Sequence, residues 1–210
     1  MLLIIAMYSK LPNLVLGFHG CDISAFNAVI HDGQHIKPSK NDYDWLGHGA
    51  YFWEHNLRRA QDWAIEQQGR GSIEQPAVIG AVLDLGHCLN LTDSEYIDLL
   101  KNEYKLLRDE MKTIGQPLPK NSGKTEDRLF RRLDCAVIEH LHSRLKTAKQ
   151  EGLNLIEPFD SARGLFSEGS PIYEDAGFRE KTHIQICVRN PNCIKGYFDP
   201  RKPSAKWSLP

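Results

Sequence analysis

The sequence predicts an α+β fold, because strand-like and helix-like segments are grouped and do not alternate. Strand-like stretches lie mostly before residue 92 and again after residue 180, whereas the longest helical periodicity lies in 93–150. Strands, then helices, then strands again, without a regular βαβ order, indicate mixed or antiparallel sheets. At 210 residues, the chain 1–210 suits a single domain with a sizeable core.

Apolar and β-branched stretches predict strands in the first part of the chain. They cover 13–22, 49–54 and the long, buried 77–91. The N-terminal run MLLIIAM is apolar as well. It is too short to span a bilayer and has no basic leader, so we expect a first strand there.

Two short helices are expected between these strands. Ser24 is a favourable N-cap for the first helix, which Gly33 ends. The second helix lies within 56–71 and ends at Gly69. One face of it, repeated at helical spacing, consists of Ala60, Trp63, Ala64 and Gln67.

The second half of the chain is expected to carry an insertion. Residues 93–150 hold two helical segments joined by a loop and form a helical insertion within the domain. Residues 159–178 are rich in Gly and Ser and predict a long, partly ordered surface loop. A strand over 181–188 and one last strand follow, and 199–210 form a loose tail.

The composition excludes several classes of protein. Lys and Arg number 26 against 27 Asp and Glu, so no global charge attracts nucleic acid or membrane, although a local basic patch can still do so. The five cysteines contain no CxxC pair, which argues against a disulfide framework and fits a reducing cytoplasm. No HExxH or Cys/His cluster occurs, so no metal is expected. Neither a GxGxxG after a strand nor a GxxxxGK[ST] loop is present.

Three strand-associated stretches stand out as candidates for a binding site: GFHGCD, LGHGAYFWE and HIQICVRNPNCIKGYF. A strand-end His-Gly is followed 32 residues later (51 minus 19) by the tyrosine of GAYF, then by a helix and a late QIC strand. This arrangement resembles the ADP-ribosyltransferase superfamily, in its diphtheria-toxin and poly(ADP-ribose) polymerase-like branch. It is also similar to uncharacterised bacterial members with HG, GxYF and QIC motifs and a YDxxxG-like loop, here Phe159-Asp160 through Gly164. The resemblance covers most of the chain except 93–150.

The resemblance implies a core of two packed, mostly antiparallel sheets with flanking helices. It implies an NAD-dependent mono-ADP-ribosyltransferase that loses nicotinamide through an oxocarbenium-like state and modifies a macromolecular acceptor, protein or nucleic acid. A toxin, a phage-defence effector and a housekeeping modifier are the three biological roles compatible with such an enzyme, and the sequence does not choose among them. We expect a cytoplasmic protein with NAD as co-substrate and no membrane partner. An antitoxin or immunity protein is a candidate partner.

The resemblance also assigns roles to residues. His19 would bond the adenine-side ribose, the Gly20 backbone would bond the nicotinamide carboxamide, and Tyr51 would pack on the nicotinamide ring. Gly49 would let the loop pass close to the ligand. Two further cofactor-binding candidates are Cys21, which stands where Ser or Thr commonly follows His-Gly, and Arg163, for which pairing with Asp160 alone is the alternative.

The late strand departs from the polymerase pattern, which places a glutamate there. Gln185 takes that position, with Ile184 as the alternative by a one-residue slip, and neither is ionisable. Transfer of a single unit is therefore favoured over chain elongation. Glu168 in the loop is the expected catalytic carboxylate, and Glu180 is the alternative. The missing glutamate also motivates a rival hypothesis, a degenerate module that binds NAD or ADP-ribose without turnover. A third hypothesis is a structural protein whose aromatic cluster is only core.

Overall fold

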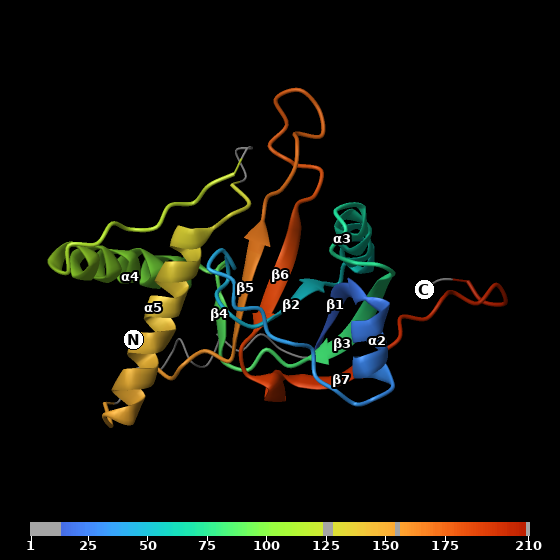
Figure 1. Cartoon of the computed structure of the whole chain (residues 1–210), viewed down its shortest axis with the longest axis horizontal. Coiled ribbons are helices and arrows are strands. Elements are labelled where there is room, and N and C mark those ends of the chain that lie inside the picture. The colour runs from blue at the N-terminus through green and yellow to red at the C-terminus, as the bar shows by residue number, and fades with distance from the viewer. Residues whose placement is uncertain (1–13, 124–127, 154–155, 209–210) are drawn as a thin grey trace.

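The computed structural model describes residues 14–123, 128–153 and 156–208, and in this part of the chain seven strands form one sheet (Figure 1). The strands are β1 (Val15–Asp22), β2 (Ala50–Glu54), β3 (Pro76–Leu83), β4 (Cys88–Asn90), β5 (Ser161–Phe166), β6 (His183–Val188) and β7 (Ile194–Phe198). The helices are α2 (Ile23–Ile30), α3 (Leu57–Gly69), α4 (Ser94–Thr113), α5 (Arg132–Gln150) and a 3₁₀ turn, η1 (Pro191–Cys193). The α+β class is confirmed.

The sheet consists of two halves joined by a short seam. Its strand order is β4-β5-β6-β2-β1-β3-β7, and every pair is antiparallel except β4–β5. The expected second sheet is therefore wrong, because β1 pairs with β2 and makes the sheet continuous. That seam contains two residue pairs, Gly17–Glu54 and Phe18–Trp53, whereas β1 pairs with β3 along eight residues. Beyond Phe18 the two halves diverge.

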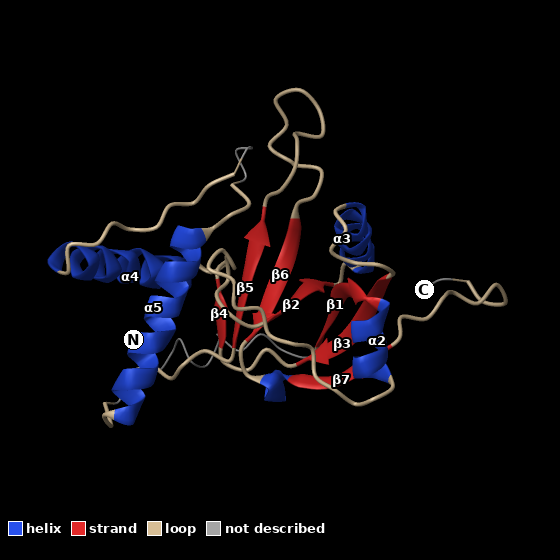
Figure 2. Ribbon diagram, in the orientation of Figure 1, coloured by secondary structure: helices blue, strands red, loops and turns tan. Residues whose placement is uncertain are grey.

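Both faces of the sheet are covered by helices (Figure 2). On one face α2 packs over a core that includes Phe52, Ile79 and Ile186, each fully buried. On the opposite face α5 covers the β4–β6 half through Ile138, Leu141 and Leu145. The same face of the seam is covered by α3, whose Ala60 packs against Phe18 and Trp53. The space between α3 and α5 on this face is where the site lies.

Two strand assignments from the sequence are corrected by the structure. The expected long strand over 77–91 divides into β3 and β4, because the chain bends at Gly86, which has a positive φ of 57°. The expected loop over 159–178 contains β5, which lies between β4 and β6. Gly164 suits a loop in sequence, but in β5 it makes room for Trp45, whose Cη2 would lie 2.7 Å from an added Cβ.

The N-cap of the first helix lies two residues earlier than expected, and the helix ends at Ile30, before Gly33. Its N-cap is Asp22, not Ser24, because the Asp22 carboxylate accepts hydrogen bonds from Ser24 N at 2.9 Å and Ser24 Oγ at 2.7 Å. The helices α4 and α5 lie within the expected insertion, and α5 contributes directly to the core. The expected strand over MLLIIAM lies outside the described residues. Residues 199–208 form neither helix nor strand. In the described part of the chain, no helix is long and apolar enough to cross a membrane.

We predict acid destabilisation through His142 on α5. Burial lowers its pKa to about 4, although Nδ1 donates to Ile138 O at 2.8 Å. His142 binds a proton near pH 6.5 in the unfolded chain but only near pH 4 in the folded chain. The contribution of neutral His142 to folding stability is therefore fully present above pH 6.5 and is lost as the pH falls from 6.5 to 4. Urea unfolding at a series of pH values from 7 to 4 should show the decrease in the free energy of unfolding. The His142→Gln variant should show a smaller decrease over the same pH range. The exposed His31, as His31→Gln, is the control. A decrease unchanged by His142→Gln contradicts the prediction.

Candidate functional site

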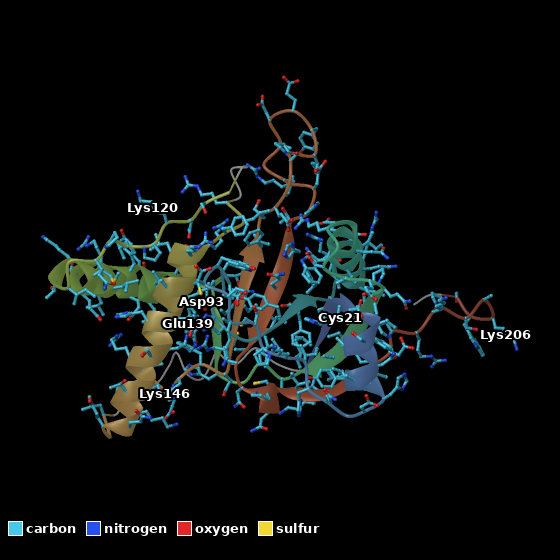
Figure 3. All side chains as sticks on the ribbon, viewed as in Figure 1. Cys21, Asp93, Lys120, Glu139, Lys146 and Lys206 are labelled. Atoms are coloured by element: carbon cyan, nitrogen blue, oxygen red, sulfur yellow. The ribbon has the colours of Figure 1, made fainter. Side chains whose placement is uncertain are left out.

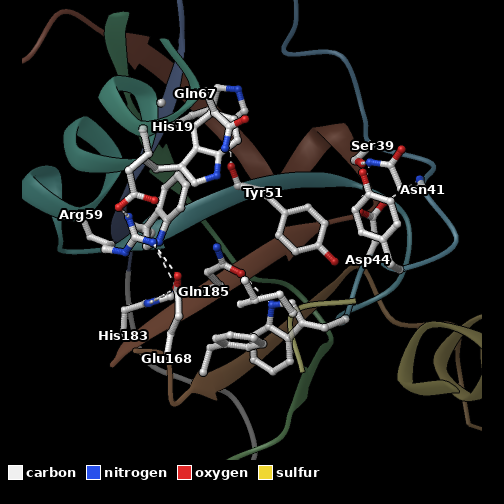
Figure 4. A pocket seen from close by; sticks show the side chains of 18 of the residues that line it. His19, Ser39, Asn41, Asp44, Tyr51, Arg59, Gln67, Glu168, His183 and Gln185 are labelled. Atoms are coloured by element: carbon white, nitrogen blue, oxygen red, sulfur yellow. Dashed lines mark hydrogen bonds and ion pairs between the residues drawn. The ribbon is translucent and has the colours of Figure 1, made fainter. Parts of the chain in front are cut away.

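A cleft of about 490 Å³ opens between α3 and the loop that precedes β2 (Figure 4). It lies on the α3 and α5 face of the sheet, at the point where β1 and β2 diverge. The predicted site residues that line it are His19, Gly20, Gly49, Tyr51, Glu168 and Gln185. They come from β1, β2, β6 and the segment after β5, so the sheet brings together residues that are far apart in sequence.

Two predicted residues do not line the cleft. Cys21 is buried in the core beneath α2, on the opposite face of the sheet (Figure 3). Arg163 also points to that face, where Nη2 donates to Glu54 Oε1 at 2.9 Å and Nη1 donates to Asn90 Oδ1 at 3.2 Å. Its expected alternative partner, Asp160, instead accepts from Asn190 Nδ2 at 2.7 Å. Strand alternation explains the placement of Arg163, because neighbouring residues of a strand face opposite sides. Cys21 shares its face of β1 with His19, but the His19 ring turns into the gap beside β2, where Nδ1 bonds Tyr51 O.

His19 bridges the two halves of the sheet. Its Nδ1 lies 2.8 Å from the backbone oxygen of Tyr51. A carbonyl oxygen only accepts, so Nδ1 carries the ring proton and Nε2 is left as an acceptor. Burial lowers the pKa of His19, which keeps the ring neutral at neutral pH. His19 therefore offers the cleft a hydrogen-bond acceptor of fixed orientation.

Gly20 directs its backbone N–H and C=O toward the gap. Leu16 O accepts from His55 N at 2.9 Å, so the even-numbered residues of β1 turn their backbone groups toward β2. Pairing with β2 ends at Phe18, and Gly20 is the next residue with this orientation. A ligand in the cleft can therefore take over the backbone pairing that β2 provides up to Phe18.

The two predicted glycines are required by the protein itself. A Cβ at Gly20 would overlap the backbone oxygen of Ala60 and lie 3.1 Å from Trp63 Cε3, so α3 needs this glycine in order to pack. A Cβ at Gly49 would lie 2.5 Å from Val188 O and 2.6 Å from Cys187 Sγ. Close packing against α3 and β6 therefore already demands glycine at both positions, and the expected approach of a ligand to them stays a prediction.

Tyr51 presents a fixed, neutral ring. Its hydroxyl donates to Gly47 O at 2.8 Å and accepts from Leu46 N at 3.0 Å. Burial raises the pKa of Tyr51 well above its ordinary value, so the phenol stays protonated. Phe52, the next residue, is fully buried on the opposite face. The expected alternation, with Tyr51 at the site and Phe52 in the core, is confirmed.

Gln185 faces the cleft with its donor group. The indole Nε1 of Trp45 lies 2.6 Å from Gln185 Oε1 and can only donate, so one of the two lone pairs of the amide oxygen is occupied. The amide NH₂ is left for a ligand. A glutamate at this position would accept hydrogen bonds, whereas Gln185 held by Trp45 donates them.

Glu168 already reaches the cleft and is held there by Arg59. Both carboxylate oxygens accept from Arg59 Nη2, at 3.1 and 3.0 Å. The alternative carboxylate, Glu180, is exposed and does not line the cleft, and its Oε2 lies 3.4 Å from Ser170 N. Glu168 is therefore the better placed of the two.

Several residues of the site were missed by sequence reasoning. The cleft is also lined by Trp45, Trp53, Arg59 and His183. Three of these bury polar atoms without a partner in the described residues: Trp53 Nε1, Arg59 Nε and Nη1, and His183 Nε2. Buried unpaired donors and acceptors are rare and often mark ligand sites. A sequence signal existed for Arg59 alone, since it lies four residues before Trp63 and so flanks the buried face of α3.

No group of three or more His, Cys, Asp or Glu side chains in the described ranges is placed to hold a metal ion.

Comparison with known proteins gives one distant relative and no family. The chain is 28% identical over 196 residues to an uncharacterized protein of Methanocaldococcus jannaschii, and the match covers 85% of this chain and 83% of the relative. No protein-family model matches the sequence, and no solved structure matches it either.

We predict that Gly20→Ala destabilises the protein without any ligand. The added methyl collides with the backbone of α3, and such overpacking costs about 1–3 kcal/mol. Gly196 in β7 is the matched control, because an added Cβ there meets nothing within 4 Å. Gly196→Ala should change the free energy of unfolding by less than about 1 kcal/mol. Urea denaturation measures both, and equal stabilities of the two variants would contradict the packing argument.

Proposed function

We propose that this protein is an NAD-dependent mono-ADP-ribosyltransferase that modifies a macromolecular acceptor, either a protein or a nucleic acid. The observation that carries the proposal is the meeting of His19, Gly20 and Tyr51 in one cleft at the end of the β1–β2 seam. The resemblance assigns these residues to NAD recognition, and they lie on two strands whose separation the sequence does not specify.

The geometry of these residues suits the nicotinamide riboside part of NAD. The backbone N–H and C=O of Gly20 match the C=O and NH₂ of the carboxamide, and the Tyr51 ring provides a surface for stacking. The neutral His19 accepts a ribose hydroxyl through Nε2. Gln185 donates its NH₂ to a ribose oxygen on the opposite side of the cleft.

In the proposed reaction, the bond between nicotinamide and the anomeric carbon breaks and its electron pair leaves with nicotinamide. The acceptor's oxygen or nitrogen then forms a bond to the same carbon and loses its proton to a base. The developing oxocarbenium ion is positive, so a carboxylate stabilises it more than it stabilises the ground state. Glu168 supplies this charge and can also take the acceptor's proton.

The proposal includes transfer of one unit only. Gln185 has no charge and its oxygen already accepts from Trp45, so it is a weaker acceptor than the glutamate that would orient a further ADP-ribose. The proposal also extends to the biological setting: a toxin or phage-defence effector that acts in the cytoplasm and is restrained by an antitoxin or immunity protein.

One observation favours a second candidate, a module that binds NAD or ADP-ribose without turnover. Glu168 is already neutralised by Arg59, and Gln185 is not ionisable. Incubation with NAD labelled on the nicotinamide ring separates the candidates. Release of nicotinamide supports the transferase, and saturable binding without release supports the module. With NAD tagged on adenine and a cell lysate, mass spectrometry of the modified fraction identifies the acceptor.

We predict that Tyr51→Ala weakens NAD binding by about 1–3 kcal/mol, by analogy with stacking of bases on aromatic side chains. Tyr51→Phe keeps the ring and should retain most of the affinity. Tyr173 is 61% exposed in the β5–β6 loop, so Tyr173→Ala is the control. Titration calorimetry measures the affinity and circular dichroism checks folding. Unchanged affinity in folded Tyr51→Ala argues against the stacking role.

We predict that Glu168→Gln slows nicotinamide release more than Gln185→Ala does. The first substitution removes the charge that faces the oxocarbenium ion, and loss of such electrostatic stabilisation costs about 100–1,000-fold in kcat. The second removes a neutral donor, for which we expect about a tenfold loss. Single-turnover assays compare the two. Near-wild-type rates of nicotinamide release in both folded variants rule out this division of labour and leave Glu180 as the alternative carboxylate.

A further inference from the structure

A buried ion pair links α3 to the segment that follows β5. Arg59 on α3 is 7% exposed in its side chain and Glu168 is 14% exposed, and one guanidinium nitrogen contacts both carboxylate oxygens. Figure 4 shows this pair at one end of the cleft, beside His183. We propose that Arg59 is the positioning residue that fixes the Glu168 carboxylate in the cleft. Its catalytic consequence rests on the proposed function, whereas the positioning itself does not.

Arg59 is anchored at both ends. Its backbone N–H donates to the N-cap Asn56 Oδ1 at 2.9 Å, which fixes the first turn of α3. Its guanidinium carbon lies 5.8 Å from the centre of the Trp53 ring, a cation–π arrangement on β2. The Arg59 side chain therefore has little conformational freedom, and a carboxylate that pairs with it is held in a defined position.

Glu168 has no comparable support from its own segment. It belongs to the irregular loop between β5 and β6, which projects from the sheet (Figure 1). Backbone bonds close this loop from Lys181 N to Glu168 O and from Glu180 N to Ser170 O, both at 3.0 Å. They position the backbone of Glu168 and leave its side-chain torsions unconstrained. His183 Nδ1 is 3.9 Å from the carboxylate, but it donates to Lys181 O at 2.5 Å.

The charges around the pair balance. Glu66 Oε1 lies 3.7 Å from Arg59 Nη1 and is itself bonded by Lys181 Nζ at 2.8 Å. Two cations thus face two carboxylates. Lys181 pairs with Glu66, so Glu168 accepts the hydrogen bonds that Arg59 donates. The arrangement selects Glu168 as the carboxylate that Arg59 orients.

The pair is retained at a cost in stability. Arg59 Nε and Nη1 are buried and have no hydrogen-bond partner in the described residues. Burying unpaired donors of a charged group is unfavourable, and an apolar side chain would avoid this. Such departures from optimal stability concentrate at functional sites. This favours a role in the site over a purely structural one.

The test compares Arg59→Gln and Arg59→Lys with Arg58→Gln. Arg58 is the matched control, since it precedes Arg59 on α3, is 91% exposed and contacts only Asp62, at 3.9 Å, among the described residues. Hydrogen exchange of the Lys181 and Glu180 amides reports on the loop. Nicotinamide release gives kcat and KM separately.

We expect Arg59→Gln to speed loop exchange at least about tenfold, because breaking a buried ion pair removes several kcal/mol. We expect kcat to fall about 10–100-fold with KM within about twofold, since misplacing a catalytic group affects the transition state more than binding. Arg59→Lys should partly restore both, and Arg58→Gln should change neither. In the double variant with Glu168→Gln, the Arg59→Gln loss should disappear.

The inference is overturned if folded Arg59→Gln has the same loop hydrogen-exchange rates and the same kcat as the wild-type protein. It is also overturned if the loss of kcat in the double variant equals the product of the losses in Arg59→Gln and Glu168→Gln, because Arg59 would then act independently of the carboxylate. If Arg59→Gln does not fold, Arg59→Lys decides by the same two readouts. If the wild-type protein releases no nicotinamide, the proposed function fails, and Arg59-dependent protection of the loop still decides the positioning.

Discussion

The hydrogen bond from His19 Nδ1 to the backbone oxygen of Tyr51, 2.8 Å long, spans the point at which the two halves of the sheet separate. Up to Phe18 the strands β1 and β2 pair through their backbones, and one residue later a side chain takes over that connection. The same bond fixes the tautomer of His19, leaves the Gly20 backbone facing an open gap and places Tyr51 beside it. The cleft therefore arises from a change in how two strands are joined, and the rest of the site is arranged around it.

Helix α3 and the loop before β2 complete this arrangement by rigid packing. Gly20 lies against the backbone of Ala60, so α3 sits unusually close to β1. On the other side, Trp45 packs over Gly164 and holds Gln185 by its amide oxygen. The site is thus supported on both sides by contacts that tolerate no larger residue. Such support favours preorganisation, because the groups that face a ligand are held before it arrives.

The balance of charge in the cleft distinguishes this site from one built around a single free carboxylate. Gln185 contributes a donor and no charge, while the carboxylate of Glu168 pairs with the guanidinium of Arg59. A carboxylate paired in this way is well positioned but partly neutralised. Its orientation is fixed, but it stabilises a positive transition state less than a free carboxylate would, because the nearby cation offsets part of its charge. That compromise is what makes both turnover and binding without turnover physically reasonable for the same geometry.

The sequence by itself determined the α+β class and the positions of α3, β2 and β6, because periodicity and glycine stops are local properties. Short motifs are local as well, and they led to the candidate residues His19, Tyr51, Glu168 and Gln185. The sequence could not place Cys21, which packs in the core beneath α2, or Arg163, which alternation turns to the opposite face. Nor could it separate β5 from a loop, since Gly164 is a strand residue only because Trp45 packs on it. Only the tertiary structure decided that one sheet forms, that its seam opens at Phe18, and that Arg59 meets Glu168, 109 residues away. These features depend on contacts between distant segments, and no local pattern encodes them.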